Sequence, residues 1–151
     1  FTDGSVYVAE NGIETVKCSR RDGLGIELLQ KVGVYVCCIS KERNPVVLTR
    51  CKKVGIDCWN AIETGDGNLE ILRKILKARK LTYDVAAYMG DDLNDIAVLR
   101  VAGFAATVPD AHPEVKKIAH YTTKAPGGNG AIREVAELIL TTQGYDPQRL
   151  V

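Results

Sequence analysis

The stretch that decides the fold is VAAYMGDDLND, residues 85–95. Its first five residues make a short apolar run typical of a buried strand, and a helix is expected to follow over residues 92–101. Three carboxylates, those of Asp91, Asp92 and Asp95, come directly after the strand. Helix capping accounts for one or two acidic residues in such a place, whereas hard oxygen ligands gathered at a strand end are what Mg²⁺ requires. The stretch therefore predicts a magnesium site, with Asp91 as the ligand and with Asp92 and Asp95 shaping or supplementing it.

Strands and helices alternate on both sides of this stretch. The apolar run at residues 34–39 (VYVCCI) predicts a parallel strand covered on both faces, and residues 5–9 and 14–19 alternate around Glu10-Asn11-Gly12 as a β-hairpin. We further expect helices over residues 22–32, 44–53, 68–79 and 131–140, a short helix from Pro113, and strands over residues 55–59 and 104–108. This alternation predicts an α/β fold, a doubly wound parallel sheet with a small β-hairpin insertion near the N-terminus.

Bulk properties agree with a single domain over residues 1–151. Hydrophobic residues make up 46% of the chain and charged residues 26%, as in an ordinary globular domain. The net charge of +1 gives no electrostatic case for nucleic acid or an anionic membrane, and no apolar run reaches the roughly 18 residues of a membrane span. The five cysteines show no CxxC spacing, which argues against a zinc site or a disulfide framework and fits a reducing cytoplasm.

Two further features could carry chemistry. Ser40 follows the 34–39 strand, and parallel sheets place their ligands beyond the carboxyl ends of strands. A hydroxyl next to a helix N-terminus can hold a phosphoryl oxygen, although serine before a helix is usually only a cap. Residues 125–130 (APGGNG) lead into a helix and form either an anion-cradling loop or a flexible turn. They lack the Lys-Ser/Thr ending of a P-loop, so nucleotide binding is not supported.

Several segments, taken in order, resemble one family. They are residues 1–4 (FTDG), 21–26 (RDGLGI), 42–47 (ERNPVV), 90–95 (GDDLND), 110–115 (DAHPEV) and 125–131 (APGGNGA). The chain resembles the small haloacid dehalogenase-type (HAD) phosphatases of phosphorylated 3-deoxy-2-ulosonic acids. These include 3-deoxy-manno-octulosonate (KDO) 8-phosphate phosphatases and sialate-type 9-phosphate phosphatases. It is also similar to the HAD domain of some CMP-sialate synthetases.

The resemblance implies a Mg²⁺-dependent phosphatase that assembles as a homotetramer and acts on a small sugar-acid phosphate. In the family an aspartate attacks phosphorus, and an aspartate two residues later protonates the leaving alcohol. By resemblance, Ser40 binds the phosphoryl oxygen and Asp91 is the acidic Mg²⁺ ligand. By the same resemblance, Glu42, Arg50 and Lys53 match positions that help to recognise substrate. Arg133 is also expected to bind substrate, because it follows the glycine-rich tail that in the family can reach a neighbouring subunit's active site.

Two departures from the family pattern matter. The family nucleophile lies in Asp-x-Asp-Gly, a few residues before a Thr-Asp-Gly. Because the hairpin follows Thr2-Asp3-Gly4 directly, we interpret Asp3-Gly4 as the later motif. We therefore expect residues 1–151 to lack the first strand and both catalytic aspartates. Taken alone, these residues are not expected to hydrolyse a substrate. The second departure is Asn68, which stands in the place of the motif lysine. An amide can hydrogen-bond phosphate but supplies no charge, and losing that charge costs several kcal/mol of transition-state stabilisation.

Three functions are compatible with these features. The first is a Mg²⁺-dependent phosphatase, and residues 42–47 resemble the sialate-linked members more than the KDO 8-phosphate phosphatases. The second is a non-catalytic tetramerisation or regulatory domain of a CMP-sialate synthetase (an acylneuraminate cytidylyltransferase), which Asn68 favours. The third is a flavodoxin- or receiver-like signalling domain, against which the segments at residues 90–95 and 125–131 argue. The sequence preceding Phe1 separates the first two, because an intact Asp-x-Asp-Gly supports the enzyme and a nucleotidyltransferase domain supports the module.

Overall fold

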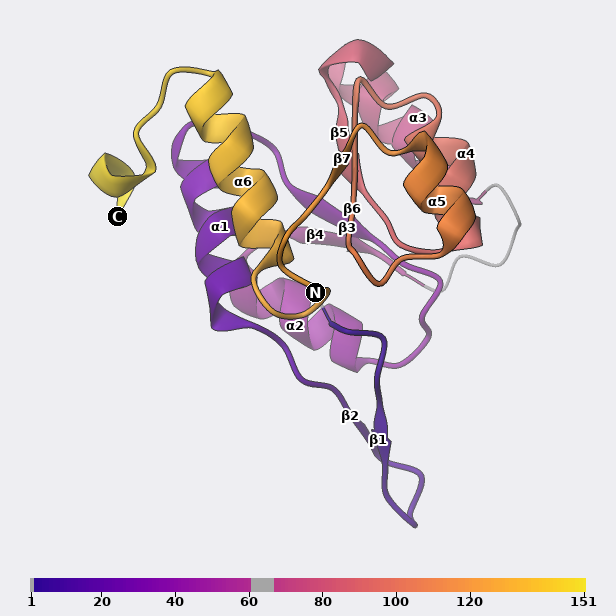
Figure 1. The fold of residues 1–151 in the computed structure, drawn as a ribbon. Coiled ribbons are helices and arrows are strands. Elements are labelled where there is room, and N and C mark those ends of the chain that lie inside the picture. The colour runs from indigo at the N-terminus through magenta and orange to yellow at the C-terminus, as the bar shows by residue number, and fades with distance from the viewer. Residues whose placement is uncertain (1, 61–66) are drawn as a thin grey trace.

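The computed structural model describes residues 2–60 and 67–151 and has the predicted α/β architecture (Figure 1). Helices α1 (Arg20–Lys31) and α6 (Ala131–Thr142) pack side by side on one side of the molecule. Helices α3 (Gly67–Arg79), α4 (Ile96–Leu99) and α5 (Pro113–Ile118) lie on the other side, around the strands. Two groups of helices therefore flank the strands, as in a doubly wound fold.

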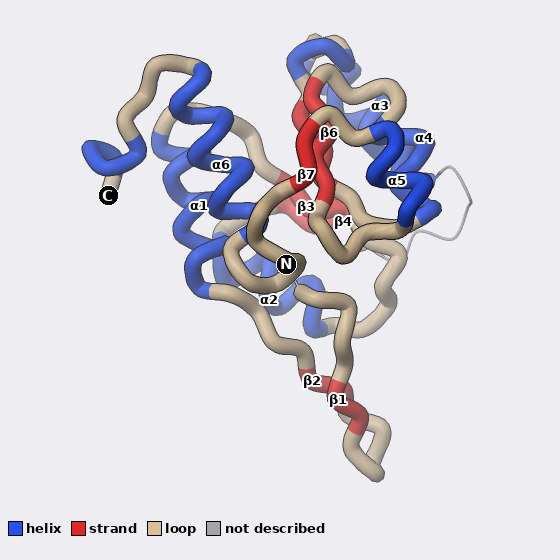
Figure 2. Tube along the Cα trace, viewed as in Figure 1, coloured by secondary structure: helices blue, strands red, loops and turns tan. Residues whose placement is uncertain are grey.

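Figure 2 shows the strands in red; apart from an antiparallel hairpin, they form two parallel pieces. In the first, β3 (Cys37–Ile39) pairs with β4 (Asp57–Trp59). In the second, β5 (Ala87–Met89), β6 (Phe104–Thr107) and β7 (Tyr121–Thr122) pair in the order β5-β6-β7. Every pairing within these two pieces is parallel, which confirms the prediction from the alternation of strands and helices. The sequence did not predict β7, because two residues are too few to show a period.

The two pieces lie next to each other without a shared hydrogen-bond ladder. Ile39 of β3 and Tyr88 of β5 pack against one core cluster, which consists of Leu72, Leu76 and Val98. Within the described residues, β3 pairs only with β4, and β5 pairs only with β6. Each of these strands therefore keeps one edge without a partner strand, and such edges are competent to bind a further strand.

The predicted hairpin is present and projects away from the body (Figure 1). Its strands, β1 (Tyr7–Val8) and β2 (Glu14–Thr15), pair antiparallel. The turn between them is closed by hydrogen bonds between Ala9 and Ile13 and between Gly12 and Ala9. The hairpin buries few of its own side chains, because two strands alone cannot make a core.

Several element boundaries differ from the predictions. The strand expected at residues 34–39 begins only at Cys37, because the N–H of Val34 donates to the carbonyl of Leu29 (3.0 Å) and closes the end of α1. The strand expected at residues 55–59 begins at Asp57. Helix α2 (Val46–Val54) begins two residues later than expected. Within the described residues, no helix has the length and apolar character needed to cross a membrane.

The region after β5 differs most from its prediction. The strand itself is shorter, because residues 83–85 form a 3₁₀ turn before it. The helix expected over residues 92–101 is a capped 3₁₀ turn, Leu93–Asp95, followed by the single helical turn α4. The turn and α4 pack with α5 against β6, around a core cluster of Leu99, Ala105, Val108, Ala111, Val115 and Ala131.

A buried carboxylate joins α1 to α6. Asp22 is 1% exposed, and its two oxygens accept hydrogen bonds from the backbone N–H groups of Gly130 (3.3 Å) and Arg133 (3.1 Å). The first N–H groups of a helix have no partner within the helix, and its N-terminus favours a negative charge. Asp22 therefore caps α6 from a position more than 100 residues earlier in the chain, and it fixes the glycine-rich segment relative to α1.

We expect Asp22→Ala to lower the free energy of unfolding by about 2 kcal/mol, because it removes a cap and leaves one buried and one partly buried donor without an acceptor. Urea unfolding followed by circular dichroism measures this loss. The matched control is Glu27→Ala, which removes an acidic side chain of the same helix whose ion pair with Lys31 is exposed and contributes at most about 1 kcal/mol. Equal losses in both variants would contradict a capping role for Asp22.

Candidate active site

The loop after β5 is organised around the side chain of Asp95. Its Oδ2 accepts hydrogen bonds from the backbone N–H groups of Asp91 (3.0 Å) and Asp92 (3.3 Å). Its Oδ1 accepts from the hydroxyl of Tyr88 (2.8 Å) and from the amide Nδ2 of Asn68 (3.2 Å). Asp95 is only 7% exposed, and a buried carboxylate is stable only with such a set of donors. Both of its oxygens therefore hold the loop in place.

Gly90 allows the loop to close on Asp95. A Cβ added at Gly90 would lie 2.5 Å from the Cβ and Cγ of Asp95, well inside the contact distance of two carbon atoms. The backbone of Gly90 is also tied to β6, because its N–H donates to Ala106 (3.2 Å) and its carbonyl accepts from the hydroxyl of Thr107 (2.7 Å). The lack of room for a side chain at position 90 therefore requires glycine between the strand and the acidic residues.

Asp91 presents its carboxylate to solvent from a fixed backbone. Its N–H donates to Asp95, and its carbonyl accepts from the N–H of His112 (2.8 Å). Within the described residues, the Asp91 carboxylate has no hydrogen bond or ion pair. Partial burial, followed by the charges of Asp95, Asp92 and Asp110, raises the pKa of Asp91 above its ordinary value. An unpaired carboxylate among other carboxylates is suited to bind a cation.

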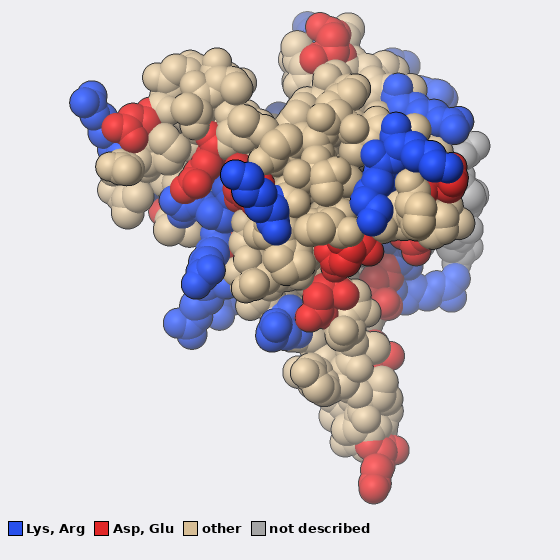
Figure 3. Space-filling model, viewed as in Figure 1, with Lys and Arg blue, Asp and Glu red and all other residues tan. Residues whose placement is uncertain are grey.

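The glycine-rich segment borders this loop and packs against the N-terminal residues. The N–H of Gly127 donates to Oδ1 of Asp110 (3.2 Å). A Cβ on Gly127 would lie 2.9 Å from the carbonyl oxygen of Thr2, and one on Gly128, where φ is +67°, would lie 2.7 Å from the N of Asp3. The segment is therefore a tightly packed turn. Figure 3 shows acidic side chains gathered beside the N-terminal segment, where the hairpin leaves the body.

Ser40 stands at the carboxyl end of β3. Its N–H donates to the carbonyl of Trp59 (2.8 Å), and its hydroxyl oxygen accepts from the N–H of Glu42 (3.1 Å). Accepting that bond leaves the hydroxyl hydrogen available to donate to an anion. Glu42 caps the same turn, because its Oε1 accepts from the N–H groups of Arg43 (2.7 Å) and Asn44 (2.8 Å). Ser40 and Glu42 therefore belong to one ordered turn after β3.

Arg50 and Lys53 lie close together in the structure, and their role in substrate recognition stays a prediction. Both line a hollow of about 300 Å³ between α1 and α2, which Arg20 also borders. The Nη2 of Arg50 donates to the carbonyl of Ser19 (2.8 Å), while its buried Nε has no partner within the described residues. Three cationic side chains and one acidic side chain, that of Glu27, line this hollow, and the excess of positive charge favours a carboxylate or phosphate as occupant.

Arg133 is less available than the resemblance implies. Its guanidinium pairs with Glu137 one turn further along α6, with Nε at 2.7 Å and Nη2 at 2.6 Å from Oε1. Its backbone N–H is taken by Asp22. Contact with substrate in a neighbouring subunit would require the side chain to leave Glu137, so this role stays a prediction.

Asn68 lies behind the acidic loop. Its side chain is buried in the first turn of α3, and its Nδ2 contacts both Asp95 and the hydroxyl of Tyr88 (3.4 Å). Its Oδ1 is buried and has no partner within the described residues. Asn68 thus supports Asp95 directly. Its assignment to the place of the motif lysine stays a prediction, and residues 64–66 of the same segment lie outside the described part of the chain.

The sequence missed the residues that support Asp91 from a distance. Tyr88, Thr107, Asp110 and His112 hold or surround the acidic loop, and no spacing in the sequence signals these contacts.

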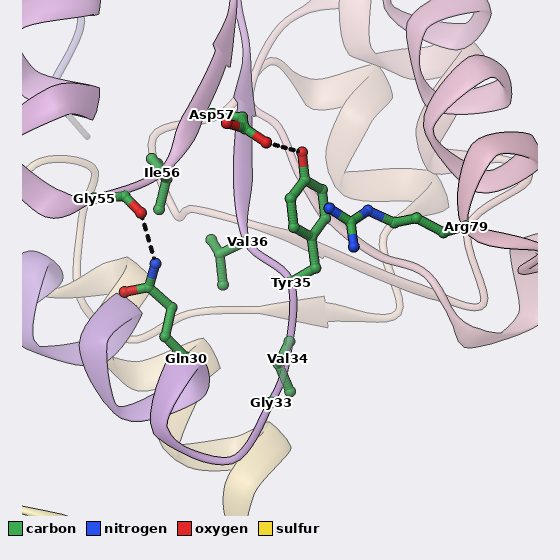
Figure 4. Close-up of a pocket in the computed structure, with 9 residues that line it drawn as sticks. All are labelled: Gln30, Gly33, Val34, Tyr35, Val36, Gly55, Ile56, Asp57 and Arg79. Carbon is green, nitrogen blue, oxygen red and sulfur yellow. Dashed lines mark hydrogen bonds between the residues drawn. The ribbon is translucent and has the colours of Figure 1, made fainter.

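A second hollow, of about 330 Å³, lies at the beginning of β3 and β4 (Figure 4). There the hydroxyl of Tyr35 donates to Asp57 (2.6 Å), and the guanidinium of Arg79 covers the Tyr35 ring at 3.2 Å. These polar groups satisfy one another, and they lie at the opposite strand ends from Ser40.

Comparison with known proteins agrees with this geometry. Residues 41–134 match the family described as haloacid dehalogenase-like hydrolase. The 3-deoxy-D-manno-octulosonate 8-phosphate phosphatase KdsC of Escherichia coli (strain K12) is 35% identical over 145 residues, which cover 95% of this chain and 76% of that protein.

Solved structures show the same relationship. A probable YrbI family phosphatase from Pseudomonas syringae pv. phaseolica superimposes with a TM-score of 0.89 at 40% identity, over 95% of this chain and 80% of that one. The 3-deoxy-D-manno-octulosonate 8-phosphate phosphatase of Moraxella catarrhalis, solved in complex with a magnesium ion, a phosphate ion and KDO, gives a TM-score of 0.87 at 34% identity, over 93% and 79% of the two chains. The chain therefore belongs to the haloacid dehalogenase-like hydrolase family.

Proposed function

We propose that this protein is a Mg²⁺-dependent phosphatase of a phosphorylated 3-deoxy-2-ulosonic acid, either KDO 8-phosphate or a sialate-type 9-phosphate, acting through an aspartyl-phosphate. The observation that carries the proposal is the carboxylate of Asp91, held without a partner within the described residues at the end of β5. The relatives support the substrate class, since the E. coli relative is a KDO 8-phosphate phosphatase and the M. catarrhalis relative was solved with magnesium, phosphate and KDO.

The acidic loop fits a magnesium ion. Carboxylate oxygens are the hard ligands that Mg²⁺ prefers, and Asp91 offers one on a fixed backbone. Asp92 is exposed, and one of its oxygens caps Leu93 (2.7 Å), so the other can supplement the site. Asp95 would shape the site from behind, because the protein already occupies both of its oxygens. Bound there, Mg²⁺ would neutralise charge between the phosphoryl group and the attacking carboxylate.

The remaining predicted residues would position the substrate. The hydroxyl of Ser40 would donate a hydrogen bond to a phosphoryl oxygen, since its own oxygen is held by Glu42. Arg50 and Lys53, beside Arg20, would attract the carboxylate of the sugar acid, because a guanidinium and ammonium around one hollow favour an anion. Asn68 would act through Asp95 rather than on the phosphate, given its position behind the loop.

We further propose that a strand carrying the nucleophile belongs between β3 and β5. The sequence of residues 1–151 contains no Asp-x-Asp-Gly. The strands β3 and β5 each keep an edge that no described strand covers, and Ser40 and Asp91 follow their carboxyl ends. A parallel strand between them would deliver its last residues beside both side chains. Residues 1–151 would then form the greater part of one domain.

A non-catalytic HAD domain of a CMP-sialate synthetase is the second candidate. Asn68 favours it, because an amide does not replace the positive charge that phosphoryl transfer uses. The structure adds that Asn68 is buried against Asp95, so its contribution is to the shape of the loop. Activity of the protein together with the residues that precede Phe1 distinguishes the two candidates.

We expect the protein with its upstream segment to release phosphate from KDO 8-phosphate or a sialate 9-phosphate only when Mg²⁺ is present. Ser40→Ala should lower kcat/KM about 10- to 100-fold, roughly 1.4–2.8 kcal/mol, because one hydrogen bond to a charged oxygen is lost. Ser5→Ala, on the hairpin, is the matched control. If an intact Asp-x-Asp-Gly is present and neither substrate is hydrolysed, the assembly-module candidate replaces the phosphatase.

Asp91→Asn should abolish stabilisation by Mg²⁺ and raise the melting temperature of the metal-free protein. The pKa of Asp91 is raised in the fold, so its ionised form destabilises the metal-free protein above that pKa, and the penalty disappears as the pH falls through it. In the wild type, Mg²⁺ at 100 times its Kd should add about 2.7 kcal/mol. Thermal melts with and without Mg²⁺ measure both effects. Glu10→Gln removes the same charge from the hairpin turn and should change neither the Mg²⁺ stabilisation nor the metal-free melting temperature. An unaltered Mg²⁺ response in Asp91→Asn would exclude Asp91 as a magnesium ligand.

We propose that the hairpin mediates the homotetramer. Apolar side chains on it, Val6, Tyr7, Val8 and Ile13, are 46–70% exposed, and the hairpin stands clear of the body (Figure 1). Exposed apolar residues concentrated on one projecting element are typical of an interaction surface, and a second copy of the same chain can offer an identical surface for symmetric packing.

Ile13→Asp should therefore shift the protein from tetramer to smaller species in size-exclusion chromatography with light scattering, because a buried unpaired charge is costly. The control is Val85→Asp, which places the same charge on a side chain that is 61% exposed, far from the hairpin in sequence. A stable monomer in the wild type would refute the tetramer, and equal dissociation of both variants would refute the role of the hairpin.

A further inference from the structure

Three cysteine thiols from three different elements converge in the structure. Cys38 of β3, Cys58 of β4 and Cys51 of α2 have sulfur atoms that all lie within 4.8 Å of one another. Cys38 and Cys58 are directly opposite each other in the parallel ladder. Cys51 is buried, and the other two are partly buried. None of the three belongs to the acidic loop or to the glycine-rich segment.

The convergence matches the requirements of a soft metal ion. Zn²⁺ binds thiolate sulfur at about 2.3 Å in tetrahedral geometry, which places the sulfurs about 3.8 Å apart. The three sulfurs would need to close by no more than about 1 Å, since none is more than 4.8 Å from another. We propose that Cys38, Cys51 and Cys58 bind a soft divalent cation of the Zn²⁺ type, with water as the fourth ligand. Each metal–sulfur bond forms as a thiol proton leaves to solvent, so three thiolates and one dication carry a net charge of −1.

Reactive chemistry at these thiols is disfavoured. Burial raises the pKa of Cys38 to about 11 and raises that of Cys51 further, so neither is an effective nucleophile at neutral pH. Packing as small apolar residues is the simpler alternative. Packing alone, however, does not require sulfur atoms to meet. Cys37, next to Cys38, points to the other face of β3, as alternate strand residues do, and is not a member of the cluster.

A bound ion would join α2 to both strands of the first parallel piece. Cys38 lies two residues before Ser40, whose N–H donates to the carbonyl of Trp59, the residue after Cys58. Metal binding to a folded site adds its binding free energy to the stability of the elements it connects. The site would thus stiffen the strand ends that present Ser40, and it would do so whether or not the acidic loop binds Mg²⁺.

The test uses the full chain, reduced and metal-free, in excess Mg²⁺ so that the acidic loop is occupied. Co²⁺ is added as a spectroscopic probe, because thiolate ligands give it a charge-transfer absorption that carboxylates do not, and Zn²⁺ is then titrated in. We expect one equivalent of Zn²⁺ to remove the absorption and raise the melting temperature. Cys51→Ala and Cys58→Ala should weaken Zn²⁺ binding at least tenfold. Cys18→Ala, at a partly buried cysteine outside the cluster, should not.

Asp91→Asn should keep the thiolate signal, which separates this site from the proposed magnesium site. No charge-transfer absorption in the wild type would overturn the proposal, as would equal Zn²⁺ affinity in Cys58→Ala and Cys18→Ala. In either case the cluster is packing only. If Cys51→Ala proves too unstable, as its burial allows, the comparison of Cys58→Ala with Cys18→Ala decides the question, because Cys58 is less buried.

Discussion

The buried carboxylate of Asp95 is the constraint on which the site depends. A charge in that position is tolerated only when donors surround it, and the donors come from α3, from β5 and from the loop itself. The same interaction therefore positions three elements at once. It also turns the backbone of Asp91 inward, and the Asp91 carboxylate has no hydrogen-bond partner among the described residues. Gly90 follows from this arrangement, because any side chain there would overlap Asp95.

A second buried carboxylate performs the corresponding task on the other side of the molecule. Asp22 satisfies the N-terminus of α6 from α1, and the glycine-rich segment that precedes α6 is thereby carried to Asp110 and the N-terminal residues. Asp22 and Asp95 each bind backbone N–H groups that would otherwise lack an acceptor. Asp22 and Asp95 thus have structural roles, whereas the chemical role is the one proposed for Asp91.

The sequence predicted what depends on local pattern. The hairpin and most helices were expected from residues close together in the chain, and the structure confirms them. The helix expected over residues 92–101 is instead a 3₁₀ turn followed by a single helical turn, and the magnesium site there stays a prediction. The sequence predicted that Asp95 shapes or supplements the site, but it could not predict the contact of Asp95 with Asn68, because Asn68 lies 27 residues away and nothing marks the pair. The strand at residues 34–39 was overestimated because the end of α1 takes its first N–H group. The cysteine spacing argued against a zinc site, yet Cys38, Cys51 and Cys58 meet in space because β3, α2 and β4 bring them together.

The proposed affinity of the acidic loop for a cation would follow from the same electrostatic repulsion that destabilises the metal-free loop. Partial burial and the charges of Asp95, Asp92 and Asp110 raise the pKa of Asp91, so the neighbouring ionised groups oppose ionisation of Asp91. Hydrogen bonds relieve Asp95, but no described side chain relieves Asp91. A bound divalent cation would remove this repulsion. The folded state would then gain a binding free energy that the unfolded chain, in which the acidic residues lie apart, does not gain. Asn68 takes part in this balance only through its hydrogen bond to Asp95.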